Sequence, residues 1–120
     1  MYKISIKSHF SAAHHLRDYN GDCENMHGHN WNVEVTAGYE ELKADGIAID
    51  FRELKRVTDE VVSSLDHKDL NSLEFLAGIN PTSENIARYI YQRIKEAGIP
   101  LLEARVSETD FYSASYTEEG

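Results

Sequence analysis

The stretch HGHNWNVEVTAGY at residues 27–39 alternates between side chains of two kinds and decides the fold class. After position 30 the odd-numbered residues are apolar. The even-numbered residues are polar, except for Gly38, so the pattern has a period of two. Such a pattern is typical of a strand with one face buried and the other in water. His27 and His29 share the odd parity, so the sequence predicts a half-buried strand with two histidines on its apolar face.

A second segment before this stretch has the same alternation. Tyr2, Ile4, Ile6 and Phe10 are apolar and share the even parity, which continues through Ala12 to His14. Residues 16–26 are polar and contain Asn-Gly-Asp, which indicates a loop between two strands. The first strand is therefore predicted to end on a histidine that faces the same side as its apolar residues.

The rest of the chain predicts two helices and then two strands. An apolar stripe with helical spacing runs from Phe51 to Leu65, and we expect Asp50 to cap it with Glu53 as its capping-box partner. A second helix is expected from residues 81–84 to Gly98, and strands are expected at 102–108 and 113–117. Strands segregated from helices predict an α+β fold with an antiparallel sheet. Because the edges of such a sheet need a partner, we expect a homo-oligomer.

Composition narrows the classes of function. The chain has 120 residues, a net charge of −9 and one cysteine. We expect one domain spanning residues 1–120, no nucleic-acid partner and no membrane partner, because no basic stripe or long apolar run is present. A single cysteine forms neither an internal disulfide nor a multi-cysteine zinc site. The N-terminal residues do not have the apolar region of a signal peptide, so we expect a cytoplasmic protein.

Three of the six histidines have positions suited to a metal. His14, His27 and His29 would converge from adjacent strands on the apolar side of the sheet. Three neutral imidazoles bind zinc and leave one coordination position open, which is typical of a catalytic site. His9 and His15 have the opposite parity and are expected at the surface or in support of a ligand.

Other side chains allow two interpretations each. Cys23, in the loop before the histidine pair, is a base or nucleophile if a nearby cation lowers the pKa of its thiol, or a small buried apolar residue. Asp66 and His67 are an acid–base pair, or the end of a helix with a favourable histidine–dipole contact.

Two further groups of residues remain open in the same way. Glu108 is an inward carboxylate that binds an N–H-rich heterocycle, or a solvated residue at the end of a strand. By default Thr82, Ser83 and Glu84 would simply open the second helix.

Taken together, these segments resemble the 6-pyruvoyltetrahydropterin synthase / 6-carboxytetrahydropterin synthase family. Six matching pieces occur in the family's order: Phe10–His14, Cys23–Asn30, Ile49–Lys55, Leu65–His67, Pro81–Asn85 and Ser107–Thr109. The resemblance implies the tunnelling fold, a four-stranded antiparallel sheet with two helices on one face. It also implies barrels of subunits, typically a hexamer built as a dimer of trimers, with active sites between subunits.

The resemblance also implies roles for individual residues. Zinc would be the cofactor and 7,8-dihydroneopterin triphosphate the substrate. The implied metal ligands are His14, His27 and His29. The implied catalytic residues are Cys23 as base, with Asp66 and His67 as its acid–base partners. The implied pterin-binding residues are Glu108, Glu84, Thr82 and Ser83.

The loop of Cys23 bears on which product is formed. Three residues separate Cys23 from His27, which resembles bacterial enzymes of queuosine biosynthesis that form 6-carboxytetrahydropterin and release acetaldehyde. Glu24 resembles a glutamate of folate-pathway members, which form 6-hydroxymethyl-7,8-dihydropterin, so a dual role and a 6-pyruvoyl product are the alternatives. His15 departs from the arginine of many relatives, and Arg17 is a substitute for holding the triphosphate.

Two hypotheses of other classes remain at this point. One is a protein that binds a metal or a pterin without catalysis. The other is a metal-independent aldolase that acts on dihydroneopterin.

Overall fold

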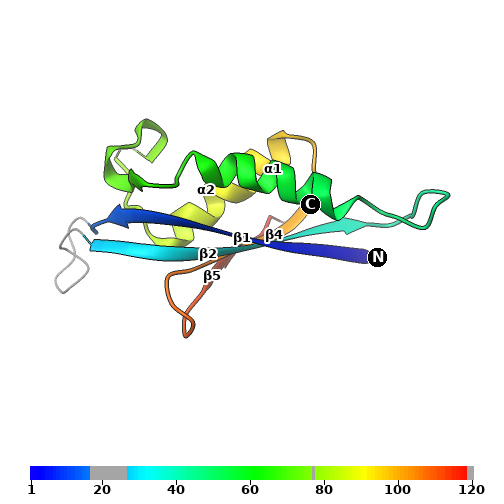
Figure 1. The fold of residues 1–120 in the computed structure, drawn as a ribbon, viewed down its shortest axis with the longest axis horizontal. Helices are drawn as coiled ribbons and strands as arrows, with labels where there is room; N and C mark the ends of the chain where they lie inside the picture. The colour runs from blue at the N-terminus through cyan, green and yellow to red at the C-terminus, as the bar shows by residue number, and fades with distance from the viewer. Residues whose placement is uncertain (17–26, 77, 119–120) are drawn as a thin grey trace.

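A computed structural model describes residues 1–16, 27–76 and 78–118 and forms a sheet covered by two helices on one face (Figure 1). The helices are α1 (Phe51–Ser63) and α2 (Ser83–Glu96). The strands are β1 (Tyr2–His14), β2 (His27–Tyr39), β3 (Lys68–Asp69), β4 (Leu101–Ser107) and β5 (Ala114–Tyr116). Their order across the sheet is β3-β1-β2-β4-β5. The predicted α+β class is confirmed, and no helix in the described ranges is long and apolar enough to cross a membrane.

The pairing of β1 with β2 forms the centre of the sheet. The two strands are antiparallel over their whole length, from Tyr2 opposite Tyr39 to His14 opposite His27. In this register Ala12 lies opposite His29. Residues directly opposite each other point to the same face of a sheet, so the register places His14 and His29 on one face. The parity argument from the sequence is therefore confirmed for these two histidines.

The core lies between that face and the helices. Phe10 and Trp31 stack with ring centroids 5.7 Å apart, and the Trp31 indole donates a hydrogen bond to the Ala12 carbonyl oxygen at 3.3 Å. Leu54 of α1 and Ile90 of α2 are fully buried against this layer. Each such side chain contributes about 1.5–3 kcal/mol to folding, so the core fixes the sheet beneath the histidines.

The sheet differs from the expected one at its outer edge. Two residues, Lys68 and Asp69, form β3, a fifth strand that pairs in parallel with Ala12 and Ala13 of β1. Two short 3₁₀ turns follow, η2 (Leu70–Ser72) and η3 (Glu74–Leu76). The structure therefore has one strand more than the four that the sequence predicted.

The start of α1 agrees with the prediction in one part and differs in another. Asp50 is the N-cap, and its carboxylate accepts a hydrogen bond from the backbone N–H of Arg52 at 2.8 Å. Glu53 does not complete a capping box: its carboxylate forms an ion pair with Arg56 at 2.7 Å. The helix also ends at Ser63 instead of Leu65.

Candidate active site at the ends of β1, β2 and β4

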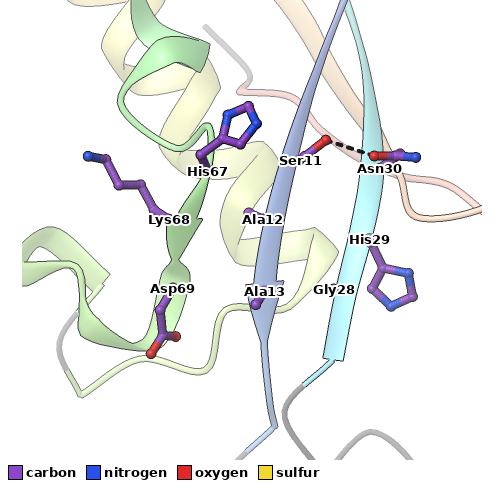
Figure 2. Close-up of a pocket in the computed structure, with 9 residues that line it drawn as sticks. All are labelled: Ser11, Ala12, Ala13, Gly28, His29, Asn30, His67, Lys68 and Asp69. Atoms are coloured by element: carbon purple, nitrogen blue, oxygen red, sulfur yellow. Dashed lines mark hydrogen bonds between the residues drawn. The ribbon is translucent and has the colours of Figure 1, made fainter.

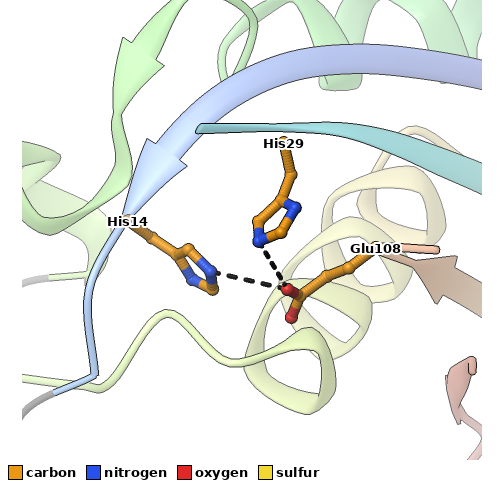
Figure 3. Close-up of side chains that lie close together, drawn as sticks. All are labelled: His14, His29 and Glu108. Atoms are coloured by element: carbon orange, nitrogen blue, oxygen red, sulfur yellow. Dashed lines mark ion pairs between the residues drawn. The ribbon is translucent and has the colours of Figure 1, made fainter. Parts of the chain in front are cut away.

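Three side chains from neighbouring strands converge where β1 ends and β2 begins (Figure 3). The Nε2 atoms of His14 and His29 lie 3.7 Å and 3.0 Å from Glu108 Oε2. Glu108 follows directly after β4, whose last residue pairs with Asn32, and this register brings the carboxylate to the histidine end of β2. The potential ligand atoms of the three residues all lie within 4.8 Å of one another, so they could hold one metal ion.

The ring of His14 is oriented by its second nitrogen. Nδ1 lies 2.7 Å from the backbone carbonyl oxygen of Pro81, just before α2. A carbonyl oxygen only accepts, so Nδ1 donates its proton in this contact, and Nε2 is the nitrogen that faces Glu108. The side chain is 1% exposed and packs edge-on against Trp31, with ring centroids 4.9 Å apart. Such a fixed, buried imidazole is typical of a metal ligand.

The charges within the cluster favour a cation. Burial acts to lower the pKa of His14, but its contacts with the Glu108 carboxylate and the Pro81 carbonyl outweigh burial and the pKa is raised. The hydrogen bond with His14 holds the pKa of Glu108 below its ordinary value, against the effect of burial. Glu108 therefore stays ionised and creates a negative potential between the two imidazoles, where either a proton or a metal ion would be stabilised.

The third predicted ligand, His27, is at the start of β2. It is opposite His14, but its side chain lies outside the described residues, as do Cys23 and Glu24. Their assigned roles stay predictions. The structure adds Glu108 as a candidate ligand. The sequence left open whether Glu108 points inward or into solvent, and its contacts with the two histidines favour the inward interpretation.

A cavity of about 330 Å³ lies beside Glu108, and its lining includes Ser83, Glu84 and Tyr112. The Ser83 hydroxyl donates a hydrogen bond to Glu108 Oε1 at 3.0 Å, while Oε2 faces the histidines. Thr82 caps α2 through a hydrogen bond that its hydroxyl accepts from the Asn85 N–H at 3.1 Å. Three of the four predicted pterin-binding residues thus line one cavity, and Thr82 fixes the helix start that carries Ser83.

Asp66 and His67 lie together at the outer edge of β1. Asp66 accepts a hydrogen bond from the Ser11 N–H at 2.9 Å, and its other oxygen lies 3.1 Å from His67 Nδ1. The hydrogen bond from Ser11, more than the contact with His67, holds the pKa of Asp66 below its ordinary value. His67 has a positive φ of 57° and is 82% exposed. The pair is therefore intact and accessible, as an acid–base pair needs to be.

Strand β1 separates this pair from the three-residue cluster. A shallow hollow of about 510 Å³ lies across the strand ends. Figure 2 shows two of its lining residues, His67 on the β3 side and His29 on β2. The small residues Ala13 and Gly28 form its floor between them. Within one chain, then, His67 of the predicted acid–base pair and His29 of the predicted metal ligands line the same hollow.

A side-chain clamp holds the end of β1. Asn71 accepts a hydrogen bond from the His15 N–H at 2.8 Å and donates one to the His15 carbonyl oxygen at 3.1 Å. The carboxamide thus continues, for one residue, the pairing that β3 makes with β1. Asp69 fixes the 3₁₀ turn in which Asn71 lies by accepting its N–H. Nothing in the sequence motifs indicated this contact.

Comparison with known proteins agrees with this geometry. The chain matches the model of the family described as 6-pyruvoyl tetrahydropterin synthase over residues 3–119. It is 37% identical, over 97% of this chain and 93% of the relative, to a 6-carboxy-5,6,7,8-tetrahydropterin synthase from Synechocystis. It is 39% identical, over 78% of this chain and 75% of the relative, to a dihydroneopterin monophosphate aldolase from Pyrococcus furiosus.

The fold extends the likeness to a solved structure. The Caenorhabditis elegans 6-pyruvoyl tetrahydropterin synthase superposes with a TM-score of 0.88 at 27% identity, over 98% of this chain and 96% of that one. The family model thus matches nearly all residues of the chain. The matched part contains the cluster of His14, His29 and Glu108 at the strand ends. The chain belongs to the 6-pyruvoyl tetrahydropterin synthase family.

Proposed function

We propose that the protein converts 7,8-dihydroneopterin triphosphate to 6-carboxy-5,6,7,8-tetrahydropterin, acetaldehyde and triphosphate with zinc as cofactor, in queuosine biosynthesis. The observation that carries the proposal is the convergence of His14, His29 and Glu108 next to a cavity that contains a second carboxylate. Relatives named 6-carboxytetrahydropterin synthase support the choice of product.

The donor atoms of the cluster fit zinc. Imidazole nitrogens and a carboxylate oxygen are ordinary zinc ligands, and the contact of His14 Nδ1 with Pro81 directs Nε2 toward the cluster. His27, which is opposite His14 in the register, is the proposed third histidine. Bound zinc would act as a Lewis acid that lowers the pKa of the hydroxyl groups on the substrate side chain.

Glu108 has two possible duties, and its two oxygens separate them. Oε2 faces the imidazoles, whereas Oε1 is held by Ser83 at the wall of the cavity. We propose that the three histidines hold the metal and that Glu108 accepts hydrogen bonds from the N–H groups of the pterin, together with Glu84. If Glu108 is instead a metal ligand, Glu108→Gln will lower zinc affinity as much as His29→Ala, which equilibrium dialysis with metal analysis measures.

Proton transfer is assigned to residues at the edge of the hollow. Asp66 orients the His67 ring through the contact with its Nδ1, and we propose that His67 donates a proton to the substrate side chain. Cys23 is the proposed base. Because β1 stands between His67 and the metal cluster of its own chain, we propose that the pair completes the site of a neighbouring subunit in a hexamer built as a dimer of trimers.

The first experiment is mass spectrometry of the products after zinc-loaded protein is incubated with 7,8-dihydroneopterin triphosphate. We expect 6-carboxytetrahydropterin and acetaldehyde in equal amounts. Cys23→Ala should abolish turnover, whereas His9→Gln, a change on the opposite face of β1, should leave it intact. If neither acetaldehyde nor any new pterin forms, or if Cys23→Ala keeps the wild-type rate, the proposal is wrong.

The second candidate is formation of 6-hydroxymethyl-7,8-dihydropterin, alone or beside the first activity. It is favoured by Glu24 in the loop of Cys23 and by the relative named dihydroneopterin monophosphate aldolase. A dominant hydroxymethyl product that disappears in Glu24→Gln would support it. Turnover that survives complete removal of zinc would favour a metal-independent aldolase over both zinc-dependent readings, and a 6-pyruvoyl product would place the chain with those family members.

A further inference from the structure

The cavity beside Glu108 has two kinds of wall. One wall carries the carboxylates of Glu84 and Glu108, with Ser83 between them at the start of α2. The other is formed by the connection between β4 and β5, which projects from the body of the sheet (orange in Figure 1). The carboxylates suit the N–H edge of a flat heterocycle. They leave the two faces of such a ring without a partner.

Tyr112 is the aromatic side chain of this second wall. It lines the cavity and is 78% exposed, a large apolar surface in contact with water. Its neighbour Phe111 is 87% exposed, yet it is not part of the lining. Two adjacent aromatic residues, both largely exposed, thus differ in their position relative to the cavity.

The connection that carries Tyr112 is held at both ends. The Thr109 hydroxyl accepts a hydrogen bond from the Phe111 N–H at 3.1 Å, which closes a tight turn just after Glu108. Ala114, two residues after Tyr112, is paired with Val106 of β4. The turn and the pairing fix the short segment between them, so the tyrosine is placed at the cavity before any ligand arrives and little conformational entropy is lost on binding.

We propose that Tyr112 is a substrate-binding residue whose ring stacks on one face of the heterocycle that Glu108 holds by its N–H edge. The assignment rests on the proposed function, because it takes the ligand to be a pterin. Stacking buries the exposed aromatic surface and selects planar rings. An aromatic side chain against a flat base contributes roughly tenfold or more to affinity.

The test is isothermal titration calorimetry with 7,8-dihydroneopterin, which has no triphosphate, so that ring contacts dominate. The proteins compared are zinc-loaded wild type, Tyr112→Leu, Tyr112→Phe and Phe111→Leu. Size-exclusion chromatography first checks that all four have the same oligomeric mass. We expect Tyr112→Leu to bind about tenfold or more weakly. We expect Tyr112→Phe to stay within about twofold, because the ring is kept, and Phe111→Leu to match wild type.

Failure of this inference and failure of the proposed function give different results. The role of Tyr112 alone is overturned if wild type binds the pterin, Glu108→Gln does not, and Tyr112→Leu binds it like wild type. If Phe111→Leu lowers the affinity for the pterin as much as Tyr112→Leu does, the effect belongs to the loop as a whole and the inference is wrong. If Tyr112→Leu changes the oligomeric mass, the effect belongs to subunit contacts and the inference is also wrong. No binding of the pterin by wild type overturns the proposed function together with the inference.

Discussion

Two contacts act on different nitrogens of His14 and give it a single orientation. Pro81 accepts from Nδ1, and Glu108 faces Nε2 at 3.7 Å. The ring is also packed against Trp31, so it has no space to turn away. His14 is therefore preorganised for a ligand at Nε2, and losing its side chain removes more than one donor atom.

We predict that His14→Ala lowers zinc affinity by about a hundredfold or more, because outer contacts alone change metal affinity by 10–100-fold. Equilibrium dialysis followed by metal analysis measures the change. His9→Ala is the matched control, since His9 is on the same strand but exposed on the other face. Equal loss in both variants, or none in His14→Ala, would remove His14 from the ligand set.

A second prediction concerns Asn71, whose carboxamide makes both hydrogen bonds to His15. Asn71→Ala is expected to lower the free energy of unfolding by about 1–2 kcal/mol and to weaken metal binding. Ser72→Ala is the control, because Ser72 bonds only within the same turn, to Asp69. Urea unfolding of both variants separates the clamp from a general effect on the turn.

At the residue scale, the sequence predicted the positions but not the contacts. Alternation placed His14 and His29 on one face, whereas Glu108 was left open between an inward and a solvated position. The hydrogen bond of His14 to Pro81 joins residues 67 positions apart, and that of Asn71 to His15 joins residues 56 positions apart. Contacts of that kind depend on how helices and strands pack, and no local pattern encodes them.

Among the elements, the long ones were predicted best. The two 13-residue strands contain six periods of alternation, and α1 and α2 each present a regular apolar stripe. Strand β3 was missed because two residues, Lys68 and Asp69, contain no period at all. Its formation depends on the open edge of β1, which only the folded sheet provides.

The cap of α1 gives a prediction for pH. Chiefly through its side-chain hydrogen bonds with Arg52, the pKa of Asp50 is lowered to about 2. A lowered folded-state pKa stabilises the fold above the ordinary value of 3.8, and the contribution is lost as the pH falls toward 2. Asp50→Asn, which caps without titrating, should therefore show a smaller drop in melting temperature between pH 4 and pH 2. Parallel curves for both proteins would contradict this account of the cap.

On the scale of the whole molecule, the described part of the sheet has two edges that its outer strands cover only in part. Strand β3 covers β1 only at Ala12 and Ala13, and β5 covers β4 only from Ala104 to Val106. Uncovered strand edges favour pairing with another chain. Together with the position of Asp66 and His67 beyond β1, this supports our proposal of a homo-oligomer with shared sites.

Mixed oligomers test whether sites are shared. His29→Ala and His67→Ala should each be inactive alone, because one lacks a metal ligand and the other lacks its proton donor. Unfolding and refolding the two variants together should restore part of the wild-type activity, through sites that combine an intact His29 from one subunit with an intact His67 from another. No recovery, although light scattering shows mixed oligomers of wild-type mass, would mean that each chain completes its own site.

The packing of Trp31 between the core and the two histidines has a practical consequence. It is the one tryptophan of the sequence, it is fully buried, and its ring lies 4.9 Å from that of His14 and 5.7 Å from that of His29. A protonated imidazole quenches indole fluorescence on contact, whereas a neutral one quenches it far less. The chain therefore contains a built-in optical probe, whose emission should brighten as His14 loses its proton and shift again when an ion is bound, without any label.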